Sequence, residues 1–153
     1  MVVDILKAFL ASKIAQVLFP KLLIAGMLAG FGAILGHMFP FYLNFDGGKG
    51  LAAFGGMICA FDGRLLVFYL TVGVGLMLLV NKSVFLPMFA AATFPLIVLL
   101  ETGDIPKVLV ALMASAVIVW RHWDKLGMVD RGEEGHIRDL LWENVFKKKG
   151  GKK

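Results

Sequence analysis

Charged residues are scarce in this chain, and their scarcity excludes an ordinary soluble domain. Of its 153 residues, 18% are charged and 59% are hydrophobic, and the mean hydropathy is +0.81. A soluble chain carries roughly a quarter charged residues and less than half apolar ones. The length allows about five or six membrane helices and leaves almost nothing for a soluble domain. The composition therefore predicts one integral membrane domain.

Several chemical features are also missing. The single cysteine, Cys59, lies in an apolar run, so the sequence offers no disulfide framework, and a buried, inert thiol is expected. The histidines stand too far apart for a metal site. No Gly-x-Ser-x-Gly elbow or activated cysteine indicates a covalent nucleophile. No cationic region precedes an apolar run at the start, so we expect no cleavable signal peptide. We also expect no metal and no cofactor.

Apolar segments alternate with short polar breaks, which predicts an all-α, polytopic membrane helix bundle. About six membrane segments are expected, over residues 4–19, 22–38, 50–61, 65–80, 84–100 and from 107 onward. The third is about 18 Å long if helical, so it is short or re-entrant. A tight turn is expected at 62–64 and a polar loop at 101–106. Gly26/Gly30 and Gly32/Gly36 have the small-xxx-small spacing that lets helix backbones approach closely in lipid.

The distribution of basic residues predicts the orientation. If 50–61 crosses the membrane, the loop after residue 38, the turn at 81–83 and the C-terminus share one side. Lys49, Lys82, Arg121 and the tail lysines would make that side the cytoplasm. Trp120 and Trp123 would then lie at the cytoplasmic interface. The net charge of +5 is modest, and its placement at segment ends suits an anionic lipid surface better than nucleic acid.

Two regions are therefore expected. Residues 1–135 form the membrane bundle, and residues 136–153 form a cytoplasmic tail. In the tail, apolar residues recur at helical spacing from His136, and lysines 147–149 and 152–153 follow. This pattern predicts an interfacial amphipathic helix with a basic end facing anionic headgroups. A disordered, solubilising tail is the alternative for the last half-dozen residues.

The segment 36–56, GHMFPFYLNFDGGKGLAAFGG, carries the most distinctive chemistry. Three glycines around Lys49 free the backbone N–H groups to point at a common centre. If the next helix begins near Gly50, its positive dipole end points at the same place. This pattern favours phosphate binding. A solvated turn is the alternative, because the full P-loop spacing and a preceding strand are both missing.

Three polar clusters lie near expected helix ends, where ionisable groups in a membrane bundle are functional candidates. They are His37 with Asp46 and Lys49, Ser83 preceded by Lys82, and Arg121-His122 with Gly132 and Glu134. A histidine can act as general base on a hydroxyl, and a cluster of Arg or Lys can hold a phosphate. The ordinary alternatives are a helix-end cap at His37, an N-cap at Ser83 and an interface anchor at Arg121.

The same segments carry a resemblance to a known family. Residues 36–52, with GHMFP and FDGGKGLA, resemble the signature GHxFPxFLxFKGGKGVAT of the bacterial membrane glycerol-3-phosphate acyltransferases that use acyl-phosphate donors, the PlsY family. DILKA at 4–8 is similar to the family's DxxKG. NKS at 81–83 falls where the family has a helix-start serine pair. Residues 121–134 follow its RHxxNIxRLxxGxE at the same spacing.

The resemblance implies transfer of an acyl group from acyl-phosphate to the sn-1 hydroxyl of glycerol 3-phosphate. The product is lysophosphatidic acid for phospholipid synthesis, formed on the cytoplasmic face of a bacterial plasma membrane. Its expected partners are these two substrates and membrane lipids. The resemblance implies phosphate contacts from Gly47, Gly48, Lys49, Gly50 and Arg121. It implies a catalytic pocket lined by His37, Ser83, His122 and Glu134.

The sequence also departs from the family pattern. The family's first signature, GSGNxGATNxxR, has no counterpart here, so we expect an acyltransferase that is weakened or is completed by a partner chain bearing that signature. In the C-terminal motif, Lys125 stands where the family has Asn, and Met128 stands where it has Arg. Leu86 stands in place of the second serine of the pair, and Asp46 in place of the lysine before GGKG. The alternative is a non-catalytic relative that binds an anionic lipid or a partner chain. A small transporter has less support, because no inverted repeat is visible.

Overall fold

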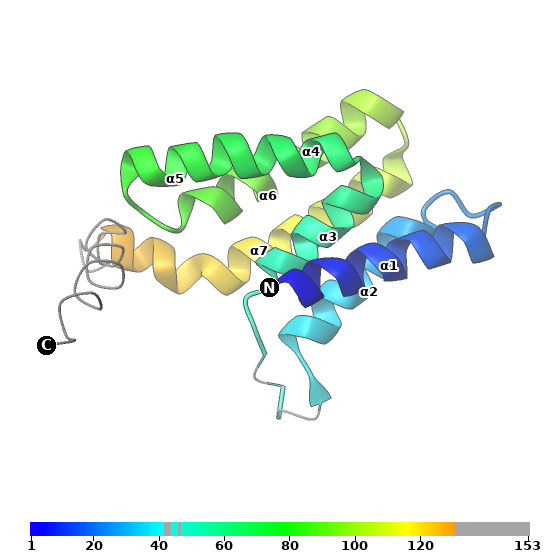
Figure 1. Ribbon diagram of the computed structural model, residues 1–153, viewed down its shortest axis with the longest axis horizontal. Helices are drawn as coiled ribbons and strands as arrows, with labels where there is room; N and C mark the ends of the chain where they lie inside the picture. Colours follow the sequence, from blue (N-terminus) through cyan, green and yellow to red (C-terminus); the bar gives the residue numbers. More distant parts are fainter. Residues whose placement is uncertain (42–43, 46, 131–153) are drawn as a thin grey trace, which may run out of the picture.

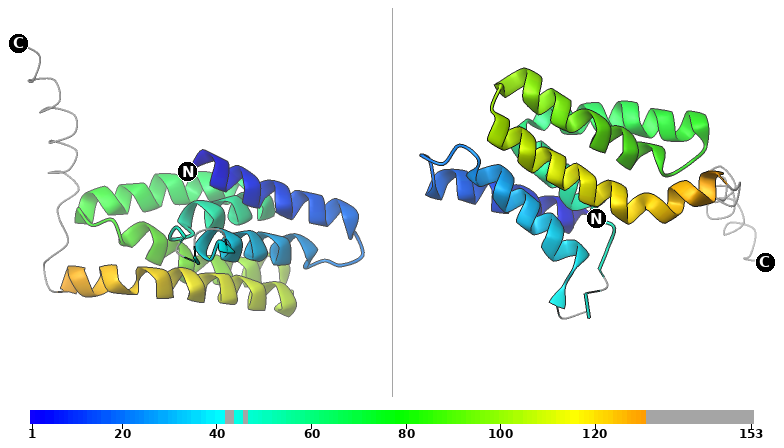
Figure 2. Two further views of the ribbon diagram at one scale, coloured as in Figure 1. Left: turned by 90° about the horizontal axis from the view of Figure 1, so that it is seen from below. Right: turned by 180° about the vertical axis from the view of Figure 1, so that it is seen from behind.

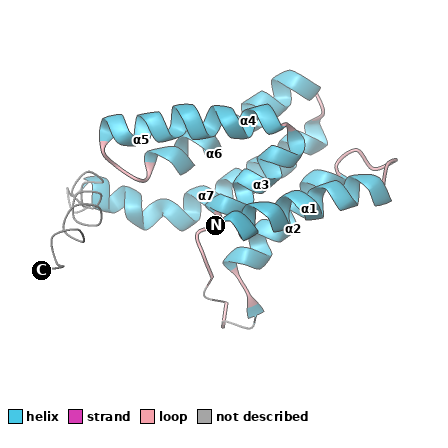
Figure 3. Cartoon of the chain, in the orientation of Figure 1, coloured by secondary structure: helices cyan, strands magenta, loops and turns pink. Residues whose placement is uncertain are grey.

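Helices make up all the regular structure that the computed structural model describes, which covers residues 1–41, 44–45 and 47–130. The elements are α1 (Val2–Leu18), α2 (Ala25–Met38), α3 (Leu51–Phe61), α4 (Gly63–Phe68), η2 (Tyr69–Gly73), α5 (Val74–Val80), α6 (Phe85–Thr102) and α7 (Ile105–Asp130). Figure 1 traces them along the chain, and Figure 3 shows helices joined by loops in the described part. The predicted all-α class is confirmed. Asp46, Glu134 and the predicted tail at 136–153 lie outside the described residues.

In the described part of the chain, three helices are long and apolar enough to cross a membrane. They are Gly63–Val80, in which α4, η2 and α5 form one rod, Phe85–Thr102, and Ile105–Met128. The apolar helices α2 and α3 are shorter, with 14 and 11 residues, and α3 is therefore about 16 Å long. The short third segment that the sequence predicts is present as a helix.

Some element boundaries differ from the sequence-based expectation. α6 continues to Thr102 and α7 begins at Ile105, so the loop expected at 101–106 is shorter. Pro106 lies within the first turn of α7, where its missing N–H costs nothing. The turn expected at 62–64 corresponds to a one-residue break between α3 and α4, where Asp62 is extended and α4 begins at Gly63. The carboxylate of Asp62 accepts a hydrogen bond of 2.7 Å from the N–H of Arg64 and caps α4.

The helices form two packed groups. α1, α2 and α3 pack against one another, and α6 packs along α7. In the left view of Figure 2, α1 and α7 lie at opposite edges, with α2 and α3 between them. Aromatic rings join α3 to α6, because Phe94 makes edge-to-face contacts with Phe54 at 5.6 Å and with Phe61 at 5.8 Å between ring centroids.

Glycines permit the close crossing of the first three helices. A Cβ at Gly30 would lie 2.6 Å from the hydroxyl oxygen of Ser12, and one at Gly26 would clash with the side chain of Gln16. The close approach predicted for this pair is confirmed. Gly32 and Gly36 face no described heavy atom within 4 Å of such a Cβ, so the same prediction is wrong for them within the described chain.

Candidate functional site

The glycine-rich loop folds back onto the end of α2. The N–H of Gly47 donates to the carbonyl of Met38 at 3.1 Å, and the N–H of Gly48 donates to the carbonyl of His37 at 3.3 Å. These bonds satisfy carbonyl groups that the end of a helix leaves without partners. A Cβ at Gly47 would lie 2.7 Å from the carbonyl oxygen of Met38, so a side chain does not fit there. The N–H groups of Gly47 and Gly48 thus donate to the C-terminal carbonyls of α2. Their contact with phosphate stays a prediction.

Gly50 ends the loop and begins α3, as the sequence predicts. Its φ of 78° places it in the left-handed region, which glycine adopts without strain. A Cβ there would lie 2.7 Å from the sulfur of Met38 and 3.2 Å from Cδ1 of Ile118, so the residue is wedged between α2 and α7. No side chain caps α3. The positive end of its dipole therefore lies directly after Lys49.

His37 connects the loop to α1. Its Nδ1 lies 3.1 Å from Oδ1 of Asp4 and 3.0 Å from Nζ of Lys7. Asp4 and Lys7 also pair with each other at 3.0 Å. Nδ1 can donate to the carboxylate or accept from the ammonium, but it cannot do both at once. The Nε2 side of the ring lies against Gly48, where an added Cβ would clash with it.

Asp4 and Lys7 are site neighbours that reasoning about candidate residues missed. Their signal in the sequence is the DILKA run at 4–8, which matches the family motif DxxKG. Their three-residue separation on a helix places both on one face of α1. Together they fix the ring of His37 between α1 and the loop.

Arg121 holds the loop from the side of α7. Its Nη2 donates to the carbonyl of Gly47 at 3.0 Å and reaches that of Gly48 at 3.5 Å. Its guanidinium also lies over the ring of Phe39, at 5.8 Å from the centroid. The predicted phosphate role of Arg121 stays a prediction, because the described contacts of its side chain are with the loop itself.

His122 and Ser83 complete the polar end of the bundle. His122 is buried, and its Nδ1 lies 2.9 Å from the carbonyl oxygen of Ile118 one turn earlier. The His122 ring also lies within electrostatic range of three cationic side chains, those of Lys49, Lys125 and Arg121. Ser83 accepts a hydrogen bond of 2.9 Å from Nζ of Lys125. Val84, not Ser83, is the cap residue of α6, and no side chain caps that helix.

The structure therefore brings together most of the predicted site. The loop at 47–50, His37, Ser83, Arg121 and His122 are linked through α2, α3, α6 and α7. The contact between Arg121 and Gly47 joins residues 74 positions apart, so the loop and the end of α7 share one end of the bundle. The described residues contain no group of three His, Cys, Asp or Glu side chains that could hold a metal ion.

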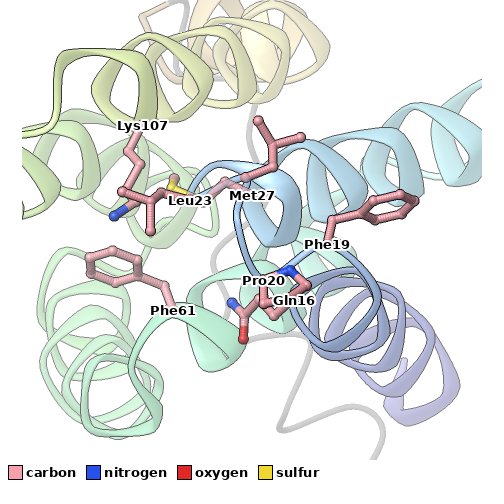
Figure 4. Close-up of a pocket in the computed structure, with 8 residues that line it drawn as sticks. Gln16, Phe19, Pro20, Leu23, Met27, Phe61 and Lys107 are labelled. Carbon is pink, nitrogen blue, oxygen red and sulfur yellow. The ribbon is translucent and has the colours of Figure 1, made fainter.

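Two of the cavities in the described part of the chain bear on this arrangement. The larger, of about 290 Å³, lies far from the loop, where the α1–α2 connection meets Phe61 and Lys107. Figure 4 shows its lining, to which Gln16 contributes a side-chain amide and Lys107 an ammonium group. Lys107 is already paired with Asp104 at 3.2 Å. This cavity therefore lies apart from the polar residues that the sequence predicts for the site.

The second cavity, of about 160 Å³, begins next to the loop and is almost wholly apolar. Its walls come from α1, α3, the α4–η2 rod and α6. They include Leu51 and Ala52, the first two residues of α3 after the loop, and Tyr69 of η2 and Leu86 of α6. An apolar space thus adjoins the cationic end of the bundle.

Comparisons with known proteins agree with this geometry. The family described as glycerol-3-phosphate acyltransferase matches residues 1–131. A glycerol-3-phosphate acyltransferase of Prochlorococcus marinus is 32% identical over 143 residues, covering 91% of this chain and 71% of the relative. One from Methylorubrum extorquens is 34% identical over 111 residues, covering 72% of this chain. The match spans about half of that relative, 54% of its length.

Two crystal structures of PlsY, an integral membrane glycerol 3-phosphate acyltransferase, have a similar fold. The glycerol 3-phosphate form superposes with a TM-score of 0.83 at 25% identity, covering 94% of this chain and 70% of that one. The lysophosphatidic acid form gives 0.80 at 26% identity, covering 87% and 68%. The family match over residues 1–131 and the likeness of sequence and fold together show that this chain belongs to the glycerol-3-phosphate acyltransferase family.

Proposed function

We propose that this protein transfers an acyl group from an acyl-phosphate to the sn-1 hydroxyl of glycerol 3-phosphate. The product would be lysophosphatidic acid, a precursor in phospholipid synthesis. The observation that carries the proposal is the position of the apolar cavity, which starts at Leu51, two residues after Lys49. An acyl-phosphate has an apolar chain and an anionic head, and the two regions match these two parts.

The chemistry needs positioning and charge stabilisation more than a covalent enzyme intermediate. The glycerol hydroxyl oxygen attacks the carbonyl carbon of the acyl-phosphate, the bond between that carbon and the oxygen shared with phosphorus breaks, and inorganic phosphate leaves with that oxygen. His37, oriented by Asp4 at 3.1 Å, would accept the hydroxyl proton as general base. Lys49, Arg121 and the start of α3 would stabilise the negative charge on phosphate.

The membrane setting is part of the proposal. Six segments would lie in a bacterial plasma membrane, with α1, α2 and the short α3 supported by the three longer helices. The loop, the turn at 81–83 and the C-terminus would face the cytoplasm, where the basic residues gather. The large apolar side chains exposed on α1 and on the α4–α5 rod, such as Leu10, Ile14, Leu70 and Leu79, suit contact with lipid.

The test is turnover by purified protein in lipid. Palmitoyl phosphate and glycerol 3-phosphate are supplied, and release of inorganic phosphate and formation of lysophosphatidic acid are measured. Lys49→Ala should reduce kcat/KM at least about a hundredfold, because it removes a charge-assisted contact to phosphate. Lys21→Ala, an exposed lysine of the α1–α2 connection, should leave turnover unchanged. Turnover that survives Lys49→Ala would contradict the assignment of the site.

One observation favours the alternative of a non-catalytic relative. The amides of Gly47 and Gly48 and the guanidinium of Arg121 are engaged within the protein. Such a relative would bind an anionic lipid or a partner chain without turnover. In the same assay it would bind glycerol 3-phosphate and release no phosphate. Turnover restored by co-expression with a chain carrying the first family signature would instead support an acyltransferase completed by a partner.

A further inference from the structure

Gly55 lies on the face of α3 that lines the apolar cavity next to the loop. The α3 residues along this cavity of about 160 Å³ include Leu51, Ala52, Gly55 and Ile58. Their spacings of three and four residues place them on one face of the helix. Ile58 lies seven residues after Leu51, which is about 10 Å along the helix axis. The cavity therefore follows α3 for about two turns and begins two residues after Lys49.

Gly55 is the residue of this face that has no side chain. In the described chain, a Cβ there would meet only Cδ1 of Leu66, at an ordinary contact distance of 3.5 Å. At the neighbouring Gly56, by contrast, a Cβ would clash with the carbonyl oxygen of Ile5. The packing of α3 thus requires glycine at 56 but not at 55. The missing side chain at 55 leaves space in the cavity.

The lining of the cavity suits an apolar occupant. Among the residues that line it, Tyr69 supplies the side-chain hydroxyl, and this group lies 2.9 Å from the hydroxyl of Thr93. Thr93 donates its own proton to the carbonyl of Phe89 at 2.7 Å, so Tyr69 is the donor to Thr93. The occupant therefore meets hydrocarbon along the cavity and the cation of Lys49 at its start. An acyl chain with an anionic head has both of these properties.

We infer that Gly55 sets the length of the acyl chain that the protein accepts, because its missing side chain keeps the cavity open from Leu51 to Ile58. The inference rests on the proposed function, in which the head of the acyl-phosphate lies at the loop and its chain runs along α3. A larger side chain at 55 would occupy the cavity one helical turn from its start, and only a short chain would fit before it. Leu66 borders the same space from α4, so removal of its side chain would reopen that space.

Turnover of a long and a short donor tests the inference. The kcat/KM values for palmitoyl phosphate and octanoyl phosphate are measured in phospholipid nanodiscs. Gly55→Leu should lower the ratio of the palmitoyl value to the octanoyl value about tenfold or more, since one methylene without room in an apolar pocket changes kcat/KM by roughly that factor. Gly75→Leu is the matched control, because it adds the same side chain to α5, where no described heavy atom lies within 4 Å of the Cβ. It should leave the ratio unchanged.

A compensating change distinguishes chain-length selection from general damage to the bundle. Leu66→Ala combined with Gly55→Leu should restore the use of palmitoyl phosphate, because exchanges that conserve volume across a contact are tolerated. Equal losses with both donors in Gly55→Leu, or no recovery in the double variant, would overturn the inference. If Gly55→Leu does not fold, Gly55→Ala takes its place and should shift the ratio in the same direction by a smaller factor.

A binding measurement separates this inference from the proposed function. Without glycerol 3-phosphate, palmitoyl phosphate should raise the thermal unfolding temperature of the unaltered protein and of Gly75→Leu. Gly55→Leu should lose most of this shift and keep the shift that octanoyl phosphate produces. If this pattern of binding is found without turnover, the proposed function fails and the acyl-chain site at Gly55 stands. Equal shifts by palmitoyl phosphate in Gly55→Leu and the unaltered protein, or no shift with either donor, would overturn the inference.

Discussion

At the scale of single residues, the contact between Gly48 and His37 explains why the loop needs glycine. A Cβ at Gly48 would clash with Nε2 of His37, so alanine there must push the imidazole away from Oδ1 of Asp4. We predict that Gly48→Ala lowers kcat between about tenfold and a hundredfold, because a displacement of this size misplaces the general base. The measurement is steady-state turnover of glycerol 3-phosphate at saturating acyl-phosphate.

Gly36→Ala is the control for this change. It adds the same methyl group one residue before His37, but no described heavy atom lies within 4 Å of the new Cβ. Its turnover should match that of the unaltered protein, and its helix should be slightly more stable because alanine favours helix over glycine. Equal losses in both variants would show that glycine flexibility, and not the contact with His37, limits the reaction.

At the scale of elements, α3 depends on one close crossing with α1. A Cβ at Gly56 would clash with the carbonyl oxygen of Ile5 and lie 2.9 Å from Cβ of Ala8, whereas one at the neighbouring Gly55 meets only Cδ1 of Leu66 at 3.5 Å. Gly56→Ala should therefore destabilise the protein by about 1–3 kcal/mol, as overpacking does. Gly55→Ala should have little effect. Thermal unfolding in detergent compares the two, and equal stability would argue against the crossing.

The same elements show what sequence can predict and what it cannot. Hydrophobic runs and Gly50 locate the helices, because burial in lipid and glycine backbone freedom are local properties. The sequence does not indicate which faces meet, so it favoured Gly32 and Gly36 equally with Gly26 and Gly30. The π-helical stretch η2 at Tyr69–Gly73 is also absent from the sequence-based expectation. There, the hydroxyls of Tyr69 and Thr93 lie 2.9 Å apart, and a contact across 24 residues leaves no local pattern.

In the candidate site, too, the sequence predicts local features but not tertiary contacts. The glycines around Lys49 mark a loop in the sequence, and in the structure the amides of Gly47 and Gly48 donate to carbonyls at the end of α2. Arg121 reads in the sequence as a phosphate ligand, and its partners in the structure are loop carbonyls 74 and 73 positions away. The residue types determine the charge of this region, whereas the tertiary packing determines the hydrogen-bond partners of each charged group.

At the scale of the whole molecule, two contacts set which polar segments share an end of the bundle. Arg121 bonds to the loop at Gly47, and Lys125 bonds to the turn at Ser83. The loop, this turn and the end of α7 therefore share one end of the bundle, and the proposed membrane arrangement puts all three on the same side. The α1–α2 connection, with Lys21, lies at the other end of α1 and α2. Any orientation that separates the loop from the 81–83 turn is incompatible with this packing.

This packing gives a topological prediction that cysteine labelling checks. In a Cys59→Ala background, Lys82→Cys and Lys21→Cys are exposed to a membrane-impermeant thiol reagent on intact bacterial cells. Lys21→Cys should react, and Lys82→Cys should react only after permeabilisation, because the basic end of the bundle is expected in the cytoplasm. The reverse pattern would place the loop outside the cell. Acyl-phosphate and glycerol 3-phosphate from the cytoplasm would then not reach it, and the proposed reaction would be contradicted. Reaction of both cysteines on intact cells would contradict the packing itself, since the α1–α2 connection and the 81–83 turn lie at opposite ends of the bundle.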